Sequence, residues 1–416
     1  MKYWGVAGCG LIAAAFTASS AAAQVTADSM IGGVQPRSMH VEGSAKAEYD
    51  SNVARSSPQA AALLGIRQND VTYSPTLSVN IIDPIGRQAL FLQGSAGYVF
   101  HQNNRQLDSE QINLTGGAGV NVGRCGSVLS GGFFRGRSQL EQIAVVTNVT
   151  NILEVKRASL GITCATPAGL GLVFTTSYDQ GDNSLPQVAV TDFRSTSVSG
   201  GILYGRPSTG SVQLLASYTR TDTPNTVFPT IGSDGYENES IGLQFSRRVG
   251  GKIQANATIN YSKVNLLTPA NAILPPVPPS RSSTGLTYTS VIDYRASSRL
   301  QFHGSFNRQI RPSLLIGSSY EIQTSYNARV DYKLGSRIQV GVGADLSRDA
   351  GQAASAAAVA TTLTNSEIKG IFASVRYQQS PRIYVVLDAR HESRTANLPQ
   401  FEYTSDRVGL ALAVSY

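Results

Sequence analysis

The feature that most constrains this chain is a period-two alternation of apolar and polar residues. In residues 253–261 one set of alternate side chains is apolar or aromatic, and the other consists of amides and a hydroxyl. Successive side chains of a β-strand point to opposite faces, so this pattern predicts a strand with one apolar and one polar face. The same alternation recurs in residues 71–81, 112–122, 170–178, 300–307 and 338–346. An all-β chain follows from this repetition.

The connections between these runs alternate in length. Short ones such as 249–252 and 334–337 contain Gly and Ser, which favour tight turns, whereas 54–69 and 265–281 are much longer. Short periplasmic turns and long extracellular loops are the layout of outer-membrane barrels. We therefore predict a single transmembrane antiparallel β-barrel of about 18 strands. Sixteen strands would also fit, and either even number places both ends of the barrel in the periplasm.

Composition agrees with a barrel. The mean hydropathy is −0.08, and the chain holds 40 Gly, 18 Tyr and 13 Phe. Lipid-facing and lumen-facing residues of a barrel average out in this way, whereas a membrane helix needs about 20 consecutive apolar residues. No stretch after the N-terminal region comes close to that length, so we expect strands to cross the membrane.

The N-terminus resembles an export signal. Lys2 precedes a short apolar region that ends in small residues, which predicts a signal peptide over 1–23 with cleavage before Gln24. A lipoprotein box at Cys9 is the alternative, but there the apolar region follows the cysteine instead of preceding it. Residues 24–40 show neither strand alternation nor a helical pattern, and we interpret them as a periplasmic N-terminal segment. The barrel is therefore expected over 41–416.

Charge gives a weaker indication of partners. Removal of the signal peptide takes away Lys2 alone, which leaves 33 basic against 27 acidic side chains and a net charge of +6. This excess could suit an anionic surface such as lipopolysaccharide, but an ordinary basic surface explains it equally well because no segment concentrates the charge. We expect outer-membrane lipid, lipopolysaccharide and the barrel assembly machinery as partners, and no nucleic acid.

The polar faces should line the interior of the barrel. They are mainly amides and hydroxyls, which exchange hydrogen bonds with hydroxylated solutes as readily as with water; an unspecific wet lumen would need the same residues. The charged positions mix both signs, which favours ion-paired wall residues over a selectivity filter, because a filter more often gathers one sign. The expected lumen-lining residues are Gln254, Asn256, Thr258, Asn260, Gln301, His303, Asn307, Arg329, Asp388 and Arg390.

No motif indicates catalysis. The four histidines are not accompanied by a nucleophile elbow, and the spacings of metal sites, phosphate loops and nucleotide fingerprints are absent from the sequence. His303 could act as a base or a proton sensor, but a wall histidine is the simpler interpretation. We expect no enzyme activity, no catalytic or metal-ligating residues and no cofactor. An outer-membrane hydrolase with a scattered site is the remaining alternative.

Two further features concern assembly and covalent stability. Cys125 and Cys164 lie at opposite ends of one predicted hairpin, and the periplasm permits them to form a structural disulfide. At the C-terminus an alternating apolar face ends in an aromatic residue, which resembles the assembly signal of outer-membrane barrels. That predicted signal comprises Leu410, Leu412, Val414 and Tyr416.

The opening of the first predicted strand, Ala45 to Arg55, contains the stretch Tyr49-Asp50-Ser51-Asn52. It resembles the start of a family of outer-membrane proteins common in alphaproteobacteria, called β-barrel porin 2, and the strand rhythm is similar over nearly the whole mature chain. Some members of that family are linked to exopolysaccharide export. The resemblance implies a polysaccharide substrate and a periplasmic polysaccharide export protein as partner, but it carries no site residues.

Two functions fit these observations. The first is a passive conduit in the cell outer membrane, for exopolysaccharide or oligosaccharide. The second is a non-conducting structural or adhesive barrel that acts through its long external loops. Conductance in a planar bilayer separates the two.

Overall fold

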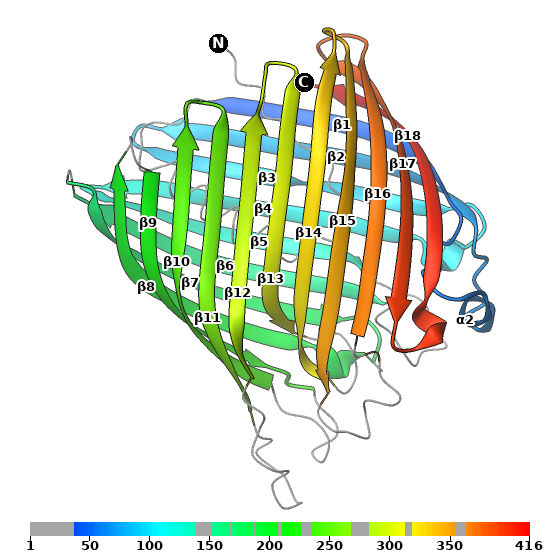
Figure 1. Ribbon diagram of the computed structural model, residues 1–416, viewed down its shortest axis with the longest axis horizontal. Helices are drawn as coiled ribbons and strands as arrows, with labels where there is room; N and C mark the ends of the chain where they lie inside the picture. The colour runs from blue at the N-terminus through cyan, green and yellow to red at the C-terminus, as the bar shows by residue number, and fades with distance from the viewer. Residues whose placement is uncertain are drawn as a thin grey trace, which may run out of the picture.

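In a computed structural model of the chain, the described residues are 37–138, 151–166, 168–186, 188–206, 210–225, 235–267, 283–312, 318–353, 363 and 365–416. They form an 18-stranded antiparallel sheet (Figure 1). The strands are β1 (Ser38–Asp50), β2 (Asp70–Ile85), β3 (Gln88–His101), β4 (Ser109–Val122), β5 (Cys125–Arg137), β6 (Ile152–Ala165), β7 (Leu170–Asn183), β8 (Phe193–Arg206), β9 (Gly210–Asp222), β10 (Gly235–Val249), β11 (Ile253–Leu266), β12 (Ser283–Arg295), β13 (Leu300–Pro312), β14 (Ser318–Leu334), β15 (Ile338–Ala353), β16 (Asn365–Gln378), β17 (Ile383–Ala396) and β18 (Tyr403–Ser415).

The sheet closes on itself. Each strand pairs with its neighbours in the sequence, and β1 also pairs with β18, from Glu42 opposite Ser415 to Asp50 opposite Arg407. Hydrocarbon offers no hydrogen-bond partners, so a sheet can cross a bilayer only when no edge is left open. The prediction of an antiparallel barrel of about 18 strands is confirmed.

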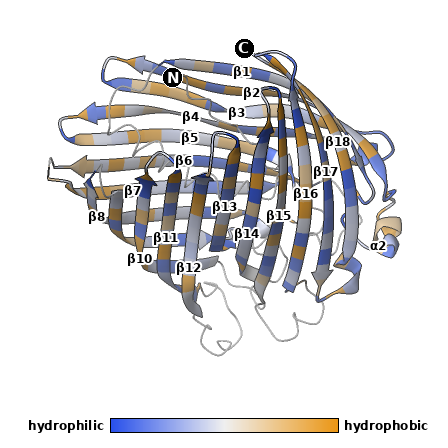
Figure 2. Cartoon of the chain, turned by 45° about the horizontal axis from the view of Figure 1, so that its top comes forward, coloured by the Kyte–Doolittle hydropathy of each residue, from blue (hydrophilic) through white to orange (hydrophobic). Residues whose placement is uncertain are grey.

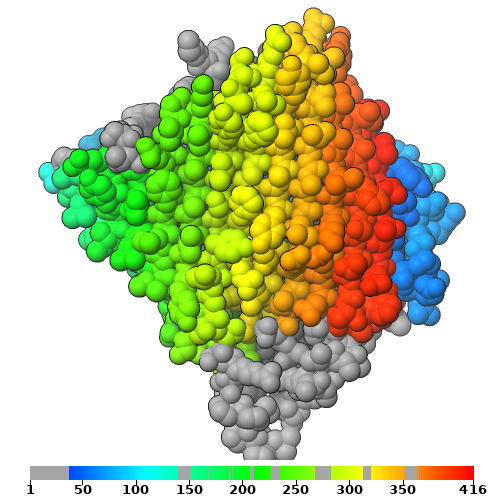
Figure 3. Space-filling view, in the orientation of Figure 1, coloured from blue at the N-terminus to red at the C-terminus, as the bar shows by residue number. Residues whose placement is uncertain are grey.

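The outer face of the barrel is apolar. The large exposed hydrophobic side chains fall on one face of each strand, as Leu243 and the opposite Ile259 do, with exposed fractions of 55% each. Along the strands the hydropathy alternates residue by residue, and strands far apart in the sequence form one continuous wall (Figures 2 and 3). This exterior is what lipid requires of a barrel.

Tyrosines and charges mark the two borders of the apolar band. Toward the loops, Tyr218 and Tyr261 lie on the outer face, and ion pairs such as Arg348 with Glu367 (2.5 Å) lie beyond them. Toward the turns the outer face ends in aromatic residues that include Tyr204. Such aromatic girdles sit at the headgroup level of a bilayer.

The turns and loops follow the predicted layout. The start of β1 and the C-terminal end of the chain lie at the end of the barrel with the short turns (Figure 1). In the turn between β10 and β11, Gly250 and Gly251 have φ of +55° and +67°, a pair of conformations that suits a tight hairpin and favours glycine. The first long loop contains a feature that the sequence analysis did not predict, the short helix α2 (Pro58–Leu63), whose N-terminus is capped by Ser57.

In the described parts of the loops, short 3₁₀ turns lie at Arg105–Leu107, Ala189–Thr191 and Pro399–Phe401. The first strand begins at Ser38, three residues before the predicted start. The predicted signal peptide over 1–23 lies outside the described residues, as does most of the long connection 265–281.

Pro75 interrupts the ladder locally. Between β2 and β3 the register runs from Tyr73 opposite Phe100 to Thr76 opposite Gly97, without pairing of Ser74 or Pro75. Proline has no N–H to donate, which explains the gap. The other side of the strand is intact, since Pro75 lies opposite Ala45 of β1.

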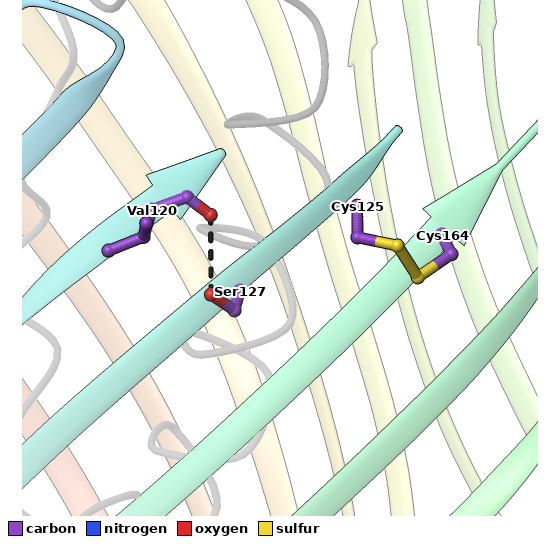
Figure 4. Close-up of a disulfide and its surroundings, with 4 residues drawn as sticks. All are labelled: Val120, Cys125, Ser127 and Cys164. Carbon is purple, nitrogen blue, oxygen red and sulfur yellow. Dashed lines mark hydrogen bonds between the residues drawn. A yellow bond between two sulfur atoms is a disulfide. The ribbon is translucent and has the colours of Figure 1, made fainter. Parts of the chain in front are cut away.

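Cys125 and Cys164 face one another across β5 and β6 and form a disulfide (Figure 4). Both lie on the outer face at the turn end of the barrel, next to Ser127, which donates a hydrogen bond to the Val120 carbonyl at 3.2 Å. The register also assigns the faces of the two phenylalanines that follow, because Phe134 lies opposite Val155 on the inner face. Phe133 therefore points outward.

A charge at the lipid-facing centre of a strand should destabilise the barrel. We expect Ile259→Arg to lower the free energy of unfolding by about 2–4 kcal/mol, because the guanidinium would enter the middle of the bilayer. The control Thr258→Arg places the same charge on the inner face and should cost much less. Equilibrium unfolding by urea in lipid vesicles measures both, and equal effects would contradict the assignment of faces.

Loss of the disulfide should destabilise the barrel as well. The cysteines are 39 residues apart in the sequence, and cross-linking a loop of that length stabilises a fold by up to about 4 kcal/mol in the chain-entropy model. We expect Cys125→Ser, Cys164→Ser and the reduced native protein to lose similar stability in the same assay. Ser127→Ala is the matched control and should change little; a stable reduced protein would refute this role.

Candidate functional site

The candidate site is the inner wall of the barrel. Residues directly opposite one another in an antiparallel pair share a face, so the inner face can be followed from strand to strand around the closed sheet. All ten predicted lumen-lining residues lie on it. They are Gln254, Asn256, Thr258 and Asn260 on β11, Gln301, His303 and Asn307 on β13, Arg329 on β14, and Asp388 and Arg390 on β17.

From β3 to β11 the inner wall is nearly uncharged. Hydroxyls and amides there bond to one another across strands, as Ser217 does to Ser240 (2.6 Å) and Ser246 to Asn256 (2.6 Å). Within the spans of the described strands, the inner-facing charges of this wall are Arg157, which pairs with Asp179, and Arg248. We call it the neutral wall. It offers many hydrogen-bond partners and little net field.

From β12 through β18 to β1 the inner wall is densely charged, and we call it the charged wall. Arg390 donates to both oxygens of Asp345 at 2.6 and 2.8 Å and contacts Glu392 at 2.9 Å, which Arg407 also reaches at 2.8 Å. Bidentate arginine–carboxylate contacts of this kind are strong and fix the side-chain orientation. The ion-paired wall that the mixed signs predict is therefore present.

Other charged side chains of this wall are also paired with a side chain of opposite charge. Lys46 of β1 reaches Asp388 of β17 at 3.1 Å, and Arg329 holds both oxygens of Asp331 at 2.8 and 2.9 Å. His303 lies 2.7 Å from Asp293, as a wall histidine would.

Glycines provide the space for these long contacts. Arg390 on β17 reaches Asp345 on β15 across Gly370 of β16, and a Cβ on that glycine would lie 2.5 Å from the guanidinium and 2.9 Å from the carboxylate. Gly409 lies in the same way beneath Lys46, where a Cβ on the glycine would be 2.4 Å from the lysine Cε. Each side chain lies flat against the wall over a residue that has none, so the ion pairs intrude little into the lumen.

At the loop end, part of the sheet leans into the barrel. The pairing of β12 with β13 ends at Tyr288 opposite Arg308, although β13 continues to Pro312. Beyond that point Tyr320 of β14 packs on Tyr236 of β10, with ring centroids 5.6 Å apart. Tyr236 belongs to the inner face, so the ends of β13 and β14 lie inside the barrel and narrow its mouth.

We call the loop-end parts of β13 and β14 the leaning hairpin. An apolar cluster and a group of three charged side chains hold it in place. Tyr236, Val264 and Tyr320 are at most 3% exposed. The neighbouring Glu321 receives Arg311 at 2.7 Å, which also lies 3.5 Å from Asp349. The alternation in the sequence does not reveal this constriction. The available signal was a pair of apolar residues, Val264 and Leu266, at the loop end of a face that is otherwise polar.

The residues of the predicted assembly signal lie on β18 or directly after it. Leu410, Leu412 and Val414 lie on the outer face of β18, and the Arg382 guanidinium lies over the ring of Tyr416 at 5.4 Å. Their role in assembly remains a prediction.

In the described part of the chain no group of three or more His, Cys, Asp or Glu side chains could hold a metal ion. Nor is any described helix long and apolar enough to span a bilayer.

A closed antiparallel sheet with an apolar exterior, aromatic borders and a polar interior defines a transmembrane β-barrel of the outer-membrane class. The protein belongs to that class, and its place is the cell outer membrane.

Several solved structures of similar fold are outer-membrane proteins of Pseudomonas. OccK2 (OpdF) of Pseudomonas aeruginosa is 12% identical, with a TM-score of 0.48 over 92% of this chain and 98% of that one. A BenF-like porin of Pseudomonas fluorescens Pf-5 is 12% identical, with 0.46 over 92% and 100%. The outer-membrane protein OpdK of Pseudomonas aeruginosa is 12% identical, with 0.45 over 91% and 99%. At this identity the likeness concerns the fold alone. No family model and no curated protein matches the chain.

A methyl group beneath an ion pair should disturb the charged wall. We expect Gly370→Ala to displace the Arg390–Asp345 contact and to cost about 1–3 kcal/mol, as overpacking does. The control Gly285→Ala is also on the inner face, but its Cβ would meet nothing within 4 Å. Unfolding in vesicles, followed by the mobility shift of the folded barrel on a gel, measures both. A neutral Gly370→Ala would mean that the contact is not fixed by packing.

Proposed function

We propose that this protein is a diffusion channel for polar solutes across the outer membrane. The observation that carries the proposal is the closed barrel of 18 strands whose inner face is polar around most of its circumference. Barrels of 16 to 18 strands leave room for an aqueous channel. In the described charged wall, the ion-paired side chains lie against the sheet, which leaves the axis of the barrel to water.

The neutral wall supports hydroxylated solutes as the cargo. Its serines, threonines and asparagines can each donate or accept a hydrogen bond, so a sugar that leaves bulk water can replace the lost bonds. The leaning hairpin of β13 and β14 limits the width of the mouth. We therefore propose oligosaccharides of limited size as the solute class. The resemblance to β-barrel porin 2 extends this proposal to exopolysaccharide, handed over by a periplasmic export protein.

Bilayer conductance and liposome swelling test the proposal. We expect stable single-channel conductance in a planar bilayer, and swelling of proteoliposomes in monosaccharides and disaccharides that falls off with larger oligomers. A deletion strain tests the extension, since loss of an exopolysaccharide conduit would reduce surface polysaccharide. The absence of both conductance and swelling would overturn the channel and favour a structural or adhesive barrel.

A further inference from the structure

The turn end of the barrel carries a set of cations that the ion-paired wall does not use. Arg248 of β10, Arg295 of β12, Lys333 of β14 and Arg376 of β16 occupy the inner face at this end, on alternate strands. Their cross-strand partners are glutamines: Gln254 for Arg248, Gln301 for Arg295, and Gln339 for both Lys333 and Arg376. We call these four cations the basic collar.

The collar is not neutralised by the carboxylates around it. Within the described residues none of its members forms an ion pair, in contrast to Arg329, Arg390 and Lys46 higher in the barrel. The nearest carboxylates are engaged elsewhere: Asp293 by His303, and Asp331 by Arg329 and Gln339. The positive charge of the collar therefore faces the lumen.

Arg376 shows most clearly that the collar has unused hydrogen-bonding capacity. Its guanidinium lies over the ring of Tyr384, 3.6 Å from the centroid, and its Nε atom is buried without a hydrogen-bond partner. Among the described residues, Arg248 has a single hydrogen bond, to the amide oxygen of Gln254 at 3.3 Å. A solute that bears an anionic oxygen could bind the exposed guanidinium of Arg248.

The adjoining turns add charge of the same sign. Lys252, Arg299, Arg337 and Arg382 lie in the four turns next to the collar and are exposed, and these turns contain no Asp or Glu. Strands two apart in a sheet are about 10 Å from one another, close to the Debye length of about 10 Å in 0.1 M salt. The fields of neighbouring collar members therefore overlap along this side of the mouth.

We infer that the basic collar is an anion-selecting site at the periplasmic mouth, which favours solutes that carry carboxylate, sulfate or phosphate groups. A cluster of one charge on one side of a mouth, bounded by low-dielectric walls, concentrates counter-ions and repels ions of its own sign. The inference rests on the proposed channel, and it assigns to that channel a preference that the neutral wall alone would not give.

The reversal potential in a gradient of potassium chloride tests the collar. For the native channel near 0.1 M salt we expect chloride to be several-fold more permeant than potassium, and this preference to shrink near 1 M, where the Debye length falls to about 3 Å. Exchange of all four collar cations for Gln should bring the permeability ratio close to 1. The single variants Arg248→Gln and Lys333→Gln should each lower it partially, so the test does not depend on the folding of the fourfold variant.

Arg247 offers a matched control, since it neighbours Arg248 and points to the outer face. Arg247→Gln removes the same charge at the same height and should leave the ratio unchanged. A conducting native channel without anion preference would overturn the collar but not the channel, and so would equal effects of the two neighbouring substitutions. No conductance at all would overturn the proposed function itself.

Discussion

The rest of the structure depends on the pairing of β1 with β18. Without it two strands would present unpaired N–H and C=O groups to hydrocarbon, at a cost of several kcal/mol for each unpaired group. Closure also fixes the register of every strand relative to the others, because a slip of one residue would turn a whole strand inside out. Even Pro75, which cannot donate to the ladder, is tolerated because it affects only the side of β2 that faces β3.

Closure of the sheet places one set of side chains against lipid and the other set in the lumen. The inner set consists of two walls that differ in charge. The neutral wall of β3 to β11 joins many of its polar side chains by short hydroxyl and amide contacts between adjacent strands. The charged wall uses longer contacts that skip a strand, as Arg390 does to reach Asp345, and these require a glycine such as Gly370 between the partners. Ion pairs stabilise the sheet in the charged wall. The basic collar at the turn end instead has positive charge that can bind solutes.

Much of the fold could be predicted from the sequence, because alternation assigns a face to each residue without knowledge of its neighbours. The strand count and the inner-face position of Asn256 or Asp388 follow from it directly. Height along the barrel and contacts across strands do not. Arg248 and Arg376 are 128 residues apart, and only the register places both at one mouth. Tyr320 escaped prediction for a similar reason, since a leaning hairpin leaves no periodic pattern.

The central claim, that successive side chains of each strand face lipid and water in turn, is tested most directly by a cysteine scan of β11. Single cysteine substitutions at positions 255 to 260, in a background with Cys125→Ser and Cys164→Ser, would be treated in vesicles with a charged maleimide that cannot enter the bilayer. The account predicts labelling at 256, 258 and 260 and protection at 255, 257 and 259. Labelling that ignores this parity would contradict it.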